Sequence, residues 1–226
     1  MEKRSAPYPI ASLDEARTRI VRLPCLGAPL RLAVPPSTDD LLERLDVDAP
    51  GAEERIPYWA ELWPSAEGLA RFLLAGRGPR RPGRVLEIGC GLGLAGLVAL
   101  RLGWDATLTD KEPEAVRWTR HNLALNGLPP ERARVLDWRD PPGERWDTVL
   151  AADVLYERPF GAALGAFLGA ALAPGGRALV AEPGRPVGLR ALAGVGGGFT
   201  MRSRPVRMAG ASVRVLIVER AERPRG

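Results

Sequence analysis

Hydrophobic positions in the middle of the chain alternate between two patterns. Short, nearly continuous apolar runs predict buried strands, and they cover residues 84–88, 105–109, 134–137, 147–152 and 177–182. Between them, apolar residues recur at helical spacing over residues 94–102, 113–126 and 160–172. Strands that alternate with helices form parallel sheets with right-handed crossovers. The pattern therefore predicts an α/β domain whose central strands run in one direction.

The two ends of the chain depart from this rhythm. Alternating apolar residues over 19–34 surround Leu26-Gly27-Ala28-Pro29 and predict a two-stranded hairpin, after which Ser37 caps a short helix through Leu45. At the other end, two strand-like runs flank Ala209-Gly210-Ala211 and predict an antiparallel pair. The expected fold is a mostly parallel sheet with an antiparallel C-terminal hairpin and a small N-terminal extension of hairpin and helix.

One further helix is predicted just before the first central strand, in the stretch IPYWAELWPSAEGLARFLLAG. Ser65 is a candidate N-terminal cap of this helix, and Gly76 ends it. Between these two residues, Leu69, Phe72 and Leu73 share one face. The helix is therefore expected to bury that face against the sheet.

The chain has the size and composition of a single domain with an extension. Its 226 residues are 46% hydrophobic, enough to bury one sizeable core. We expect residues 1–55 to form the extension, packed on a main domain of residues 56–226. Residues 1–17 lack the apolar centre of a signal peptide, and no apolar segment is long enough to span a bilayer. Cys25 and Cys90 have no paired spacing, so the expected compartment is a reducing cytoplasm, and no metal site is predicted.

The formal charge of +5 does not by itself indicate a nucleic-acid partner. Lys3 and Lys111 are the only lysines, and the many arginines are scattered with acidic residues close by. This distribution is more typical of a biased composition than of a phosphate-binding stripe. We therefore expect neither nucleic acid nor a membrane as a partner, and the oligomeric state stays open.

The stretch RVLEIGCGLGLAG, residues 84–96, contains two competing glycine signatures. Read from Gly91, GLGLAG fits the G-x-G-x-x-G of dinucleotide binders; read from Glu87, EIGCGLG fits the acidic G-x-G-x-G of S-adenosylmethionine binders. Asp110, which follows the second strand, does not discriminate, because NAD binders also place an acid there. The predicted antiparallel C-terminal pair does discriminate between the two signatures. It favours the S-adenosylmethionine signature, because a dinucleotide fold continues with another crossover and parallel strands.

Together these features resemble a class I, seven-stranded, S-adenosylmethionine-dependent methyltransferase over residues 56–219. Ligands of open α/β sheets bind beyond the carboxyl ends of the strands. In this reading Glu87 lies near the ammonium group of the cofactor and Asp110 accepts its ribose hydroxyls. After the third strand, Asp137 accepts the adenine amino hydrogen and Trp138 stacks on adenine, although an aromatic that merely closes the sheet edge is the plainer alternative. The backbone that passes closest to the ligand belongs to Gly89, Gly91 and Gly93.

A narrower resemblance rests on Asp-x-x-Tyr after the fourth strand, on Trp138, and on PYWAELWPSAEGLARFL upstream. These stretches are similar to the protein lysine methyltransferase family that includes the electron-transfer flavoprotein β-subunit enzyme. The resemblance implies that Trp63 and the backbone of Ala152 contact the cofactor, and that Asp153 and Tyr156 position the substrate. For Trp63, with its aromatic neighbours, an apolar contact that fixes the start of the helix is the plainer alternative.

The expected reaction is methyl transfer to a lysine of a protein substrate. A lysine arrives protonated, because its reference pKa is about 10.4, and a carboxylate beside it favours the charged form. We therefore expect Asp153 to capture and orient the amine, Tyr156 to accept or relay a hydrogen bond, and the proton to leave to water. A small-molecule N- or O-methyltransferase, an NAD-dependent oxidoreductase and a non-catalytic interaction protein are the alternatives.

Overall fold

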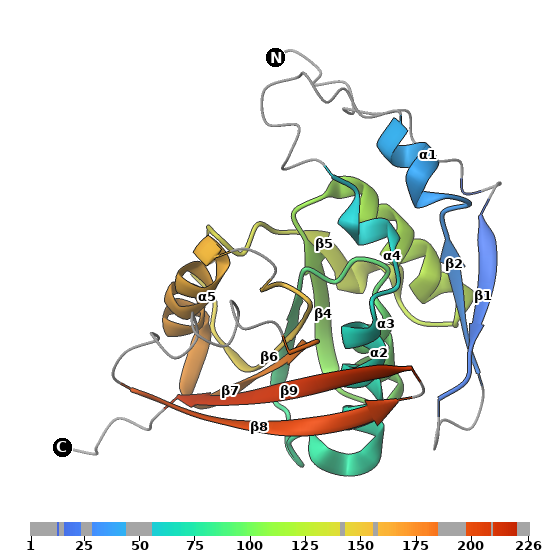
Figure 1. The fold of residues 1–226 in the computed structure, drawn as a ribbon. Coiled ribbons are helices and arrows are strands. Elements are labelled where there is room, and N and C mark those ends of the chain that lie inside the picture. The colour runs from blue at the N-terminus through green and yellow to red at the C-terminus, as the bar shows by residue number, and fades with distance from the viewer. Residues whose placement is uncertain are drawn as a thin grey trace.

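The computed structural model describes residues 13, 16–23, 29–43, 56–140, 143–155, 158–184, 198–208 and 210–220. A seven-stranded sheet forms the centre of the molecule, with strands in the order β5-β4-β3-β6-β7-β9-β8. Its strands are β3 (Arg84–Ile88), β4 (Asp105–Asp110), β5 (Ala133–Val135), β6 (Trp146–Ala152), β7 (Leu172–Glu182), β8 (Phe199–Met208) and β9 (Ala211–Arg220). The first five are parallel, whereas β9 is antiparallel to β7 and to β8 (Figure 1). The predicted fold class is therefore confirmed.

Helices cover both faces of this sheet. One face packs against α2 (Pro64–Phe72), α3 (Leu94–Arg101) and α4 (Pro113–Leu125), through a core that includes Leu69, Leu97 and Trp118. The other face packs against α5 (Arg158–Ala171), through Phe167 and Leu168 (Figure 1). The shorter elements are α1 (Thr38–Glu43), the 3-10 turns η3 (Tyr58–Ala60) and η5 (Pro130–Arg132), and the π-turn η4 (Leu73–Arg77).

Two predicted boundaries differ from the structure. Strand β7 begins at Leu172, so the turn predicted at Pro174-Gly175-Gly176 lies inside the strand as an irregularity: Trp146 pairs with Leu172, but Thr148 pairs with Arg177. A bulge of this kind adds residues to one strand without ending the pairing, which apolar periodicity does not reveal. Strand β5 ends at Val135, so the residues expected at its tip belong to the turn that follows.

The predicted cap of α2 is wrong. Trp63 is the N-terminal cap, in an extended conformation, and Pro64 occupies the first turn, where its missing N–H costs nothing. Ser65 therefore lies inside the helix, where it is fully buried. The predicted start of α1 is confirmed, because Asp40 donates its N–H to Ser37 Oγ at 3.1 Å. The predicted end after α2 is also confirmed, because Gly76 leaves the helical conformation at φ 67°.

The N-terminal hairpin is confirmed as β1 (Arg17–Val21) and β2 (Leu30–Val34), while its turn at 24–28 and the end of the predicted helix at 44–45 lie outside the described residues. The edge of β2 away from β1 rests on α4 (Figure 1). Asn122 exchanges two hydrogen bonds with the backbone of Ala33, and Asn126 does the same with Arg31. Four residues of a helix rise about 6 Å and two residues of a strand span about 6.6 Å, so both amides fit one edge.

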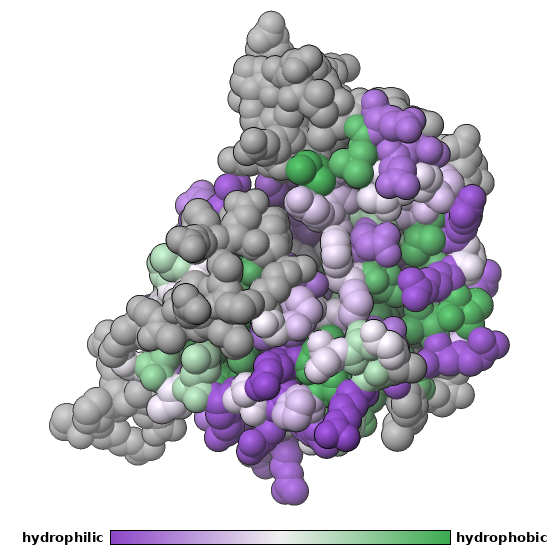
Figure 2. All heavy atoms as spheres, in the orientation of Figure 1, coloured by the Kyte–Doolittle hydropathy of each residue, from purple (hydrophilic) through white to green (hydrophobic). Residues whose placement is uncertain are grey.

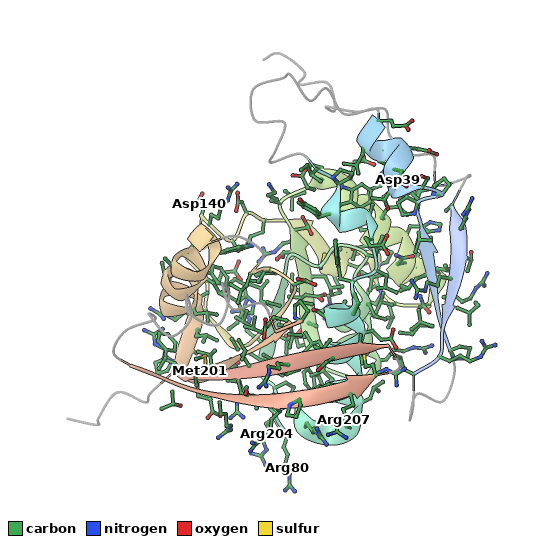
Figure 3. All side chains as sticks on the ribbon, viewed as in Figure 1. Asp39, Arg80, Asp140, Met201, Arg204 and Arg207 are labelled. Atoms are coloured by element: carbon green, nitrogen blue, oxygen red, sulfur yellow. The ribbon has the colours of Figure 1, made fainter. Side chains whose placement is uncertain are left out.

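The surface mixes polar and apolar residues on the face drawn in Figure 2, with polar residues gathered along its lower edge. Figure 3 labels Arg80 and, on β8, Arg204 and Arg207 at this lower edge, whereas Asp39 lies on α1 at the upper end of the view. No helix among the described residues is both long and apolar enough to cross a membrane.

Candidate active site

A cavity of about 400 Å³ lies at the carboxyl ends of β3, β4 and β6. Strand order reverses at β3, which has β4 on one side and β6 on the other, and this is where open α/β sheets bind ligands. The N-terminal end of α2 and the turn before it close a further wall. The cavity is lined by ten of the predicted site residues, namely Trp63, Glu87, Gly89, Gly91, Gly93, Asp110, Asp137, Trp138, Ala152 and Asp153. The eleventh, Tyr156, lies outside the described residues.

The glycine loop between β3 and α3 presents backbone to the cavity. Gly91 has φ 52°, and a Cβ there would lie 3.2 Å from the carbonyl oxygen of Trp59. Its N–H donates to Asp110 Oδ2 at 3.0 Å, and its carbonyl accepts from Thr119 Oγ1 at 2.7 Å. Gly93 caps α3 in the left-handed conformation, with no side chain to bond the first helical N–H groups. The loop is thus fixed from β4 and α4 while its inner face stays bare.

Glu87 supplies the cap that Gly93 cannot. Its Oε2 accepts the N–H of Gly96, in the first turn of α3, at 3.0 Å. The side chain is only 2% exposed, and burial raises its pKa to about 8, with a smaller contribution from the charge of Asp110. The Oε2 atom caps the N-terminal end of α3, and the side chain of Glu87 also lines the cavity.

Asp110 is fixed by two backbone groups. Its Oδ2 accepts from Gly91 and its Oδ1 accepts the N–H of Glu112 at 3.0 Å. Burial raises the pKa of Asp110 to about 6, although those two hydrogen bonds act in the opposite direction. A carboxylate has about four lone pairs, so two stay available toward the cavity when two accept N–H groups. This is the arrangement needed to bind a pair of vicinal hydroxyls.

Asp137 and Trp138 line the cavity from the turn after β5, but both are also engaged elsewhere. Asp137 pairs with Arg139 at 2.8 Å; partial burial acts to raise the pKa of Asp137, and the Arg139 hydrogen bonds outweigh it and keep that pKa below its usual value. Trp138 is buried and meets Phe167 of α5 edge to face, with ring centroids 6.3 Å apart. The plainer reading of Trp138, an aromatic that closes the sheet edge, thus holds alongside its place in the cavity wall.

Aromatic residues at the start of α2 and in the turn before it form another part of the cavity wall. Trp63 donates its ring N–H to the carbonyl oxygen of Tyr58 at 2.8 Å, and the two rings lie 6.3 Å apart. Trp59 is buried instead and packs on Trp118 in the core. All three residues line the cavity, and Trp59 in addition packs in the core, as the packing alternative expects.

The tip of β6 brings a further carboxylate to the cavity. Ala152 is the last residue of the strand, and Asp153 follows with φ 58°. The N–H of Asp153 donates to the carbonyl of Ala181 in β7 at 2.9 Å, and its Oδ2 accepts from the hydroxyl of Ser65 at 3.1 Å. The side chain is thereby tied to α2, which the sequence pattern did not indicate.

Sequence reasoning missed two other residues near the glycine loop. Cys90 lines the cavity as a buried thiol, and burial raises the pKa of this thiol well above its usual value. Its Sγ lies 3.5 Å from Thr119 Oγ1, the hydroxyl that also donates to Gly91. Cys90 could have been found from its place between the glycines, but nothing in the helical pattern singles out Thr119.

Comparison with known proteins gives consistent results. The sequence matches the lysine methyltransferase family over residues 55–186. Electron transfer flavoprotein beta subunit lysine methyltransferase of Xenopus laevis is 32% identical over 131 residues, which are 57% of this chain and 53% of that protein. Protein N-lysine methyltransferase METTL21A of Danio rerio is 35% identical over 112 residues, 46% of this chain and 50% of that protein. The chain thus spans about half the length of the curated relatives it matches.

A solved structure with the same fold is magnesium protoporphyrin IX methyltransferase of Synechocystis with bound S-adenosylmethionine. It aligns with a TM-score of 0.56 and 17% identity over 82% of this chain and 92% of that one. At this identity the likeness shows the fold alone. This shared fold agrees with the antiparallel pair β8 and β9, the feature that favoured the S-adenosylmethionine signature over the dinucleotide-binding signature.

Proposed function

Since the chain belongs to the lysine methyltransferase family, we propose that it transfers a methyl group from S-adenosylmethionine to a lysine side chain of a protein substrate. The observation that carries the proposal is one cavity lined by Glu87 and Asp110, at the tips of β3 and β4, and by Asp153, at the tip of the neighbouring β6. Two fixed carboxylates beside bare backbone suit the donor, and the third suits a cationic acceptor. The family match also removes the NAD-dependent oxidoreductase from consideration.

The residues of the cavity fit the proposed cofactor. A volume of about 400 Å³ lies in the range of small-molecule sites. Asp110 would bind the ribose hydroxyls with its remaining lone pairs, and Glu87 would face the ammonium, which lowers the pKa of a carboxylate beside it. Trp138 and Asp137 would contact adenine. The backbone of Gly89, Gly91, Gly93 and Ala152 and the ring of Trp63 would complete the contacts. When bound, S-adenosylmethionine supplies a methyl group on a positively charged sulfur.

Protein groups on the acceptor side have to position the amine. Alignment of two reacting groups can supply up to about 7–11 kcal/mol in favourable models, so orientation is the main task. Asp153 attracts the lysine ammonium and fixes its direction, and Tyr156 accepts or relays a hydrogen bond. The lysine proton leaves to water, because a carboxylate opposes deprotonation of the amine beside it.

The N-terminal residues 1–55 are proposed as an extension of the main domain, 56–226. Support comes from the shared core, in which Leu30 and Leu32 of β2 pack with Trp118 and Leu123 of α4. The proposed compartment is a reducing cytoplasm, as the unpaired cysteine spacing predicts; Cys90 is a buried free thiol.

Labelled methyl transfer tests the proposed function. The full chain is incubated with methyl-tritiated S-adenosylmethionine and a lysate of its source, and the mixture is separated on a gel. We expect label on a protein band, with methyl-lysine identified by mass spectrometry, and about 100-fold slower labelling with Asp153→Asn. Label that stays with small molecules would contradict the protein substrate and favour a small-molecule methyltransferase.

A further inference from the structure

The hydroxyl of Ser65 makes a contact that joins α2 to the tip of β6. Ser65 is fully buried, and its Oγ donates to Asp153 Oδ2 at 3.1 Å across a sequence separation of 88 residues. A hydroxyl has one proton to donate, and a charged carboxylate only accepts. The direction of this hydrogen bond is therefore fixed, from α2 to the carboxylate at the cavity.

Asp153 needs such support because of its backbone. It is the only non-glycine residue with positive φ among the described parts of the chain. A residue in this region stays there only when its surroundings fix it. The bond from its N–H to Ala181 fixes the backbone against β7, and the bond from Ser65 fixes the carboxylate against α2.

We infer that Ser65 is a positioning residue, whose hydroxyl sets the orientation of the Asp153 carboxylate toward the incoming amine. The inference rests on the proposed function, since it concerns the acceptor side of the same reaction. Trp63, two residues earlier, lines the cavity at the start of the same helix. One rigid helix thus carries both a wall of the cavity and the group that orients the carboxylate.

The fold places Ser65 there for a local reason. Pro64 occupies the first turn of α2, so the next side chain belongs to the helix instead of capping it. On the same helix, Gly68 packs closely against β9: a Cβ at this position would lie only 2.7 Å from Cγ1 of Val213. The close approach of α2 to the sheet lets a short side chain reach Asp153.

The test uses Ser65→Ala, with Ser65→Thr to restore a hydroxyl. Ser65→Ala is expected to lower kcat about 10-fold to 100-fold, the usual range for a hydrogen bond to a charged group, with S-adenosylhomocysteine affinity unchanged. Ser65→Thr should recover part of that loss. In an Asp153→Asn background, Ser65→Ala should have little further effect, because both changes remove the same contact.

Thr148→Val is the matched control for loss of a buried hydroxyl. Thr148 lies near the N-terminal end of β6, away from Asp153, which follows the C-terminal end of the strand. Its hydroxyl donates to the carbonyl of Pro82 at 2.9 Å. It should lower stability without a change in kcat. Unchanged kcat in Ser65→Ala, or an equal loss in the Asp153→Asn background, would overturn the assignment.

A crystal structure of Ser65→Ala separates this inference from the proposed function. We expect the Asp153 carboxylate to turn away from its present position. If wild type transfers no methyl group to a protein lysine but the carboxylate turns, the proposed function fails and the positioning role stands. If the carboxylate keeps its position in the variant, the positioning role is wrong, whatever the substrate.

Discussion

Two parts of the cavity contrast, and we name them after their proposed ligands: the donor half at the tips of β3 and β4, and the acceptor half at the tip of β6. In the donor half, Glu87 and Asp110 are 2% and 7% exposed; Glu87 accepts one backbone N–H and Asp110 accepts two, all from residues nearby in the sequence. In the acceptor half, Asp153 depends on a hydroxyl from α2, far away in sequence. Local backbone therefore builds the donor half, whereas long-range packing builds the acceptor half.

A methyl group at Gly96 should break the donor half most severely. A Cβ there would lie 2.3 Å from both Glu87 Oε2 and Leu108 Cγ, and neither buried neighbour can withdraw. We expect Gly96→Ala to lower the free energy of unfolding by about 3 kcal/mol, as overpacked sites do. The control is Gly169→Ala in α5, where a Cβ meets nothing within 4 Å. Equal urea midpoints for the two variants would contradict the close approach.

Asp153→Asn should damage the acceptor half alone. Loss of the charge that attracts the lysine should lower kcat about 100-fold, in the range expected for a contact to a charged group. S-adenosylhomocysteine affinity, measured by calorimetry, should stay at the wild-type value. Near-normal turnover would remove Asp153 from the mechanism.

Asp110→Asn should damage the donor half alone, and so affect cofactor affinity more than turnover. The amide can accept fewer hydrogen bonds than the carboxylate, so S-adenosylhomocysteine affinity should fall about 10-fold to 100-fold. Turnover at saturating cofactor should fall much less. The exposed Asp140→Asn, which does not line the cavity, is the control. Unchanged affinity in Asp110→Asn would place the ribose elsewhere.

The pH dependence of stability should report the buried Glu87. Its pKa is raised from 4.5 to about 8, so above pH 4.5 the unfolded chain loses this proton before the folded protein does. The free energy of unfolding of the ligand-free protein should therefore fall as pH rises toward 8, by up to about 1.4 kcal/mol per pH unit from this group.

Asp110 contributes in the same direction only up to about pH 6. Urea unfolding between pH 6 and pH 8 thus isolates Glu87. Glu87→Gln should flatten the slope there, because the amide does not titrate. An identical slope in wild type and variant would show that Glu87 is already charged in the folded protein.

The smallest effect is expected at Asn126, outside both halves. Asn126→Ala removes the two hydrogen bonds to Arg31 and should lower the free energy of unfolding by about 1 kcal/mol. Cofactor affinity and kcat should both stay unchanged, because Asn122 still bonds Ala33 and the carbonyl of Leu92 in the glycine loop. A loss of cofactor affinity would mean that the hairpin supports the loop through Asn126 as well.

The sequence was informative where neighbours in the chain are also neighbours in space. Parallel strands meet at one edge, so Glu87, Asp110 and Asp153 could be assigned to one cavity from their places at strand ends. Ser65 could not, because its partner is 88 residues away, and the same residue fits the pattern of a helix cap. The irregular pairing of β7 with β6 was also hidden, since glycine and proline signal a turn and a bulge alike.

The most direct test of the central claim is a crystal structure of the full chain with S-adenosylhomocysteine. We predict ribose hydroxyls on Asp110, the amino acid portion against the glycine loop and Glu87, and the sulfur directed toward Asp153. A ligand bound elsewhere, or a sulfur on the side of the sheet away from Asp153, would contradict the account.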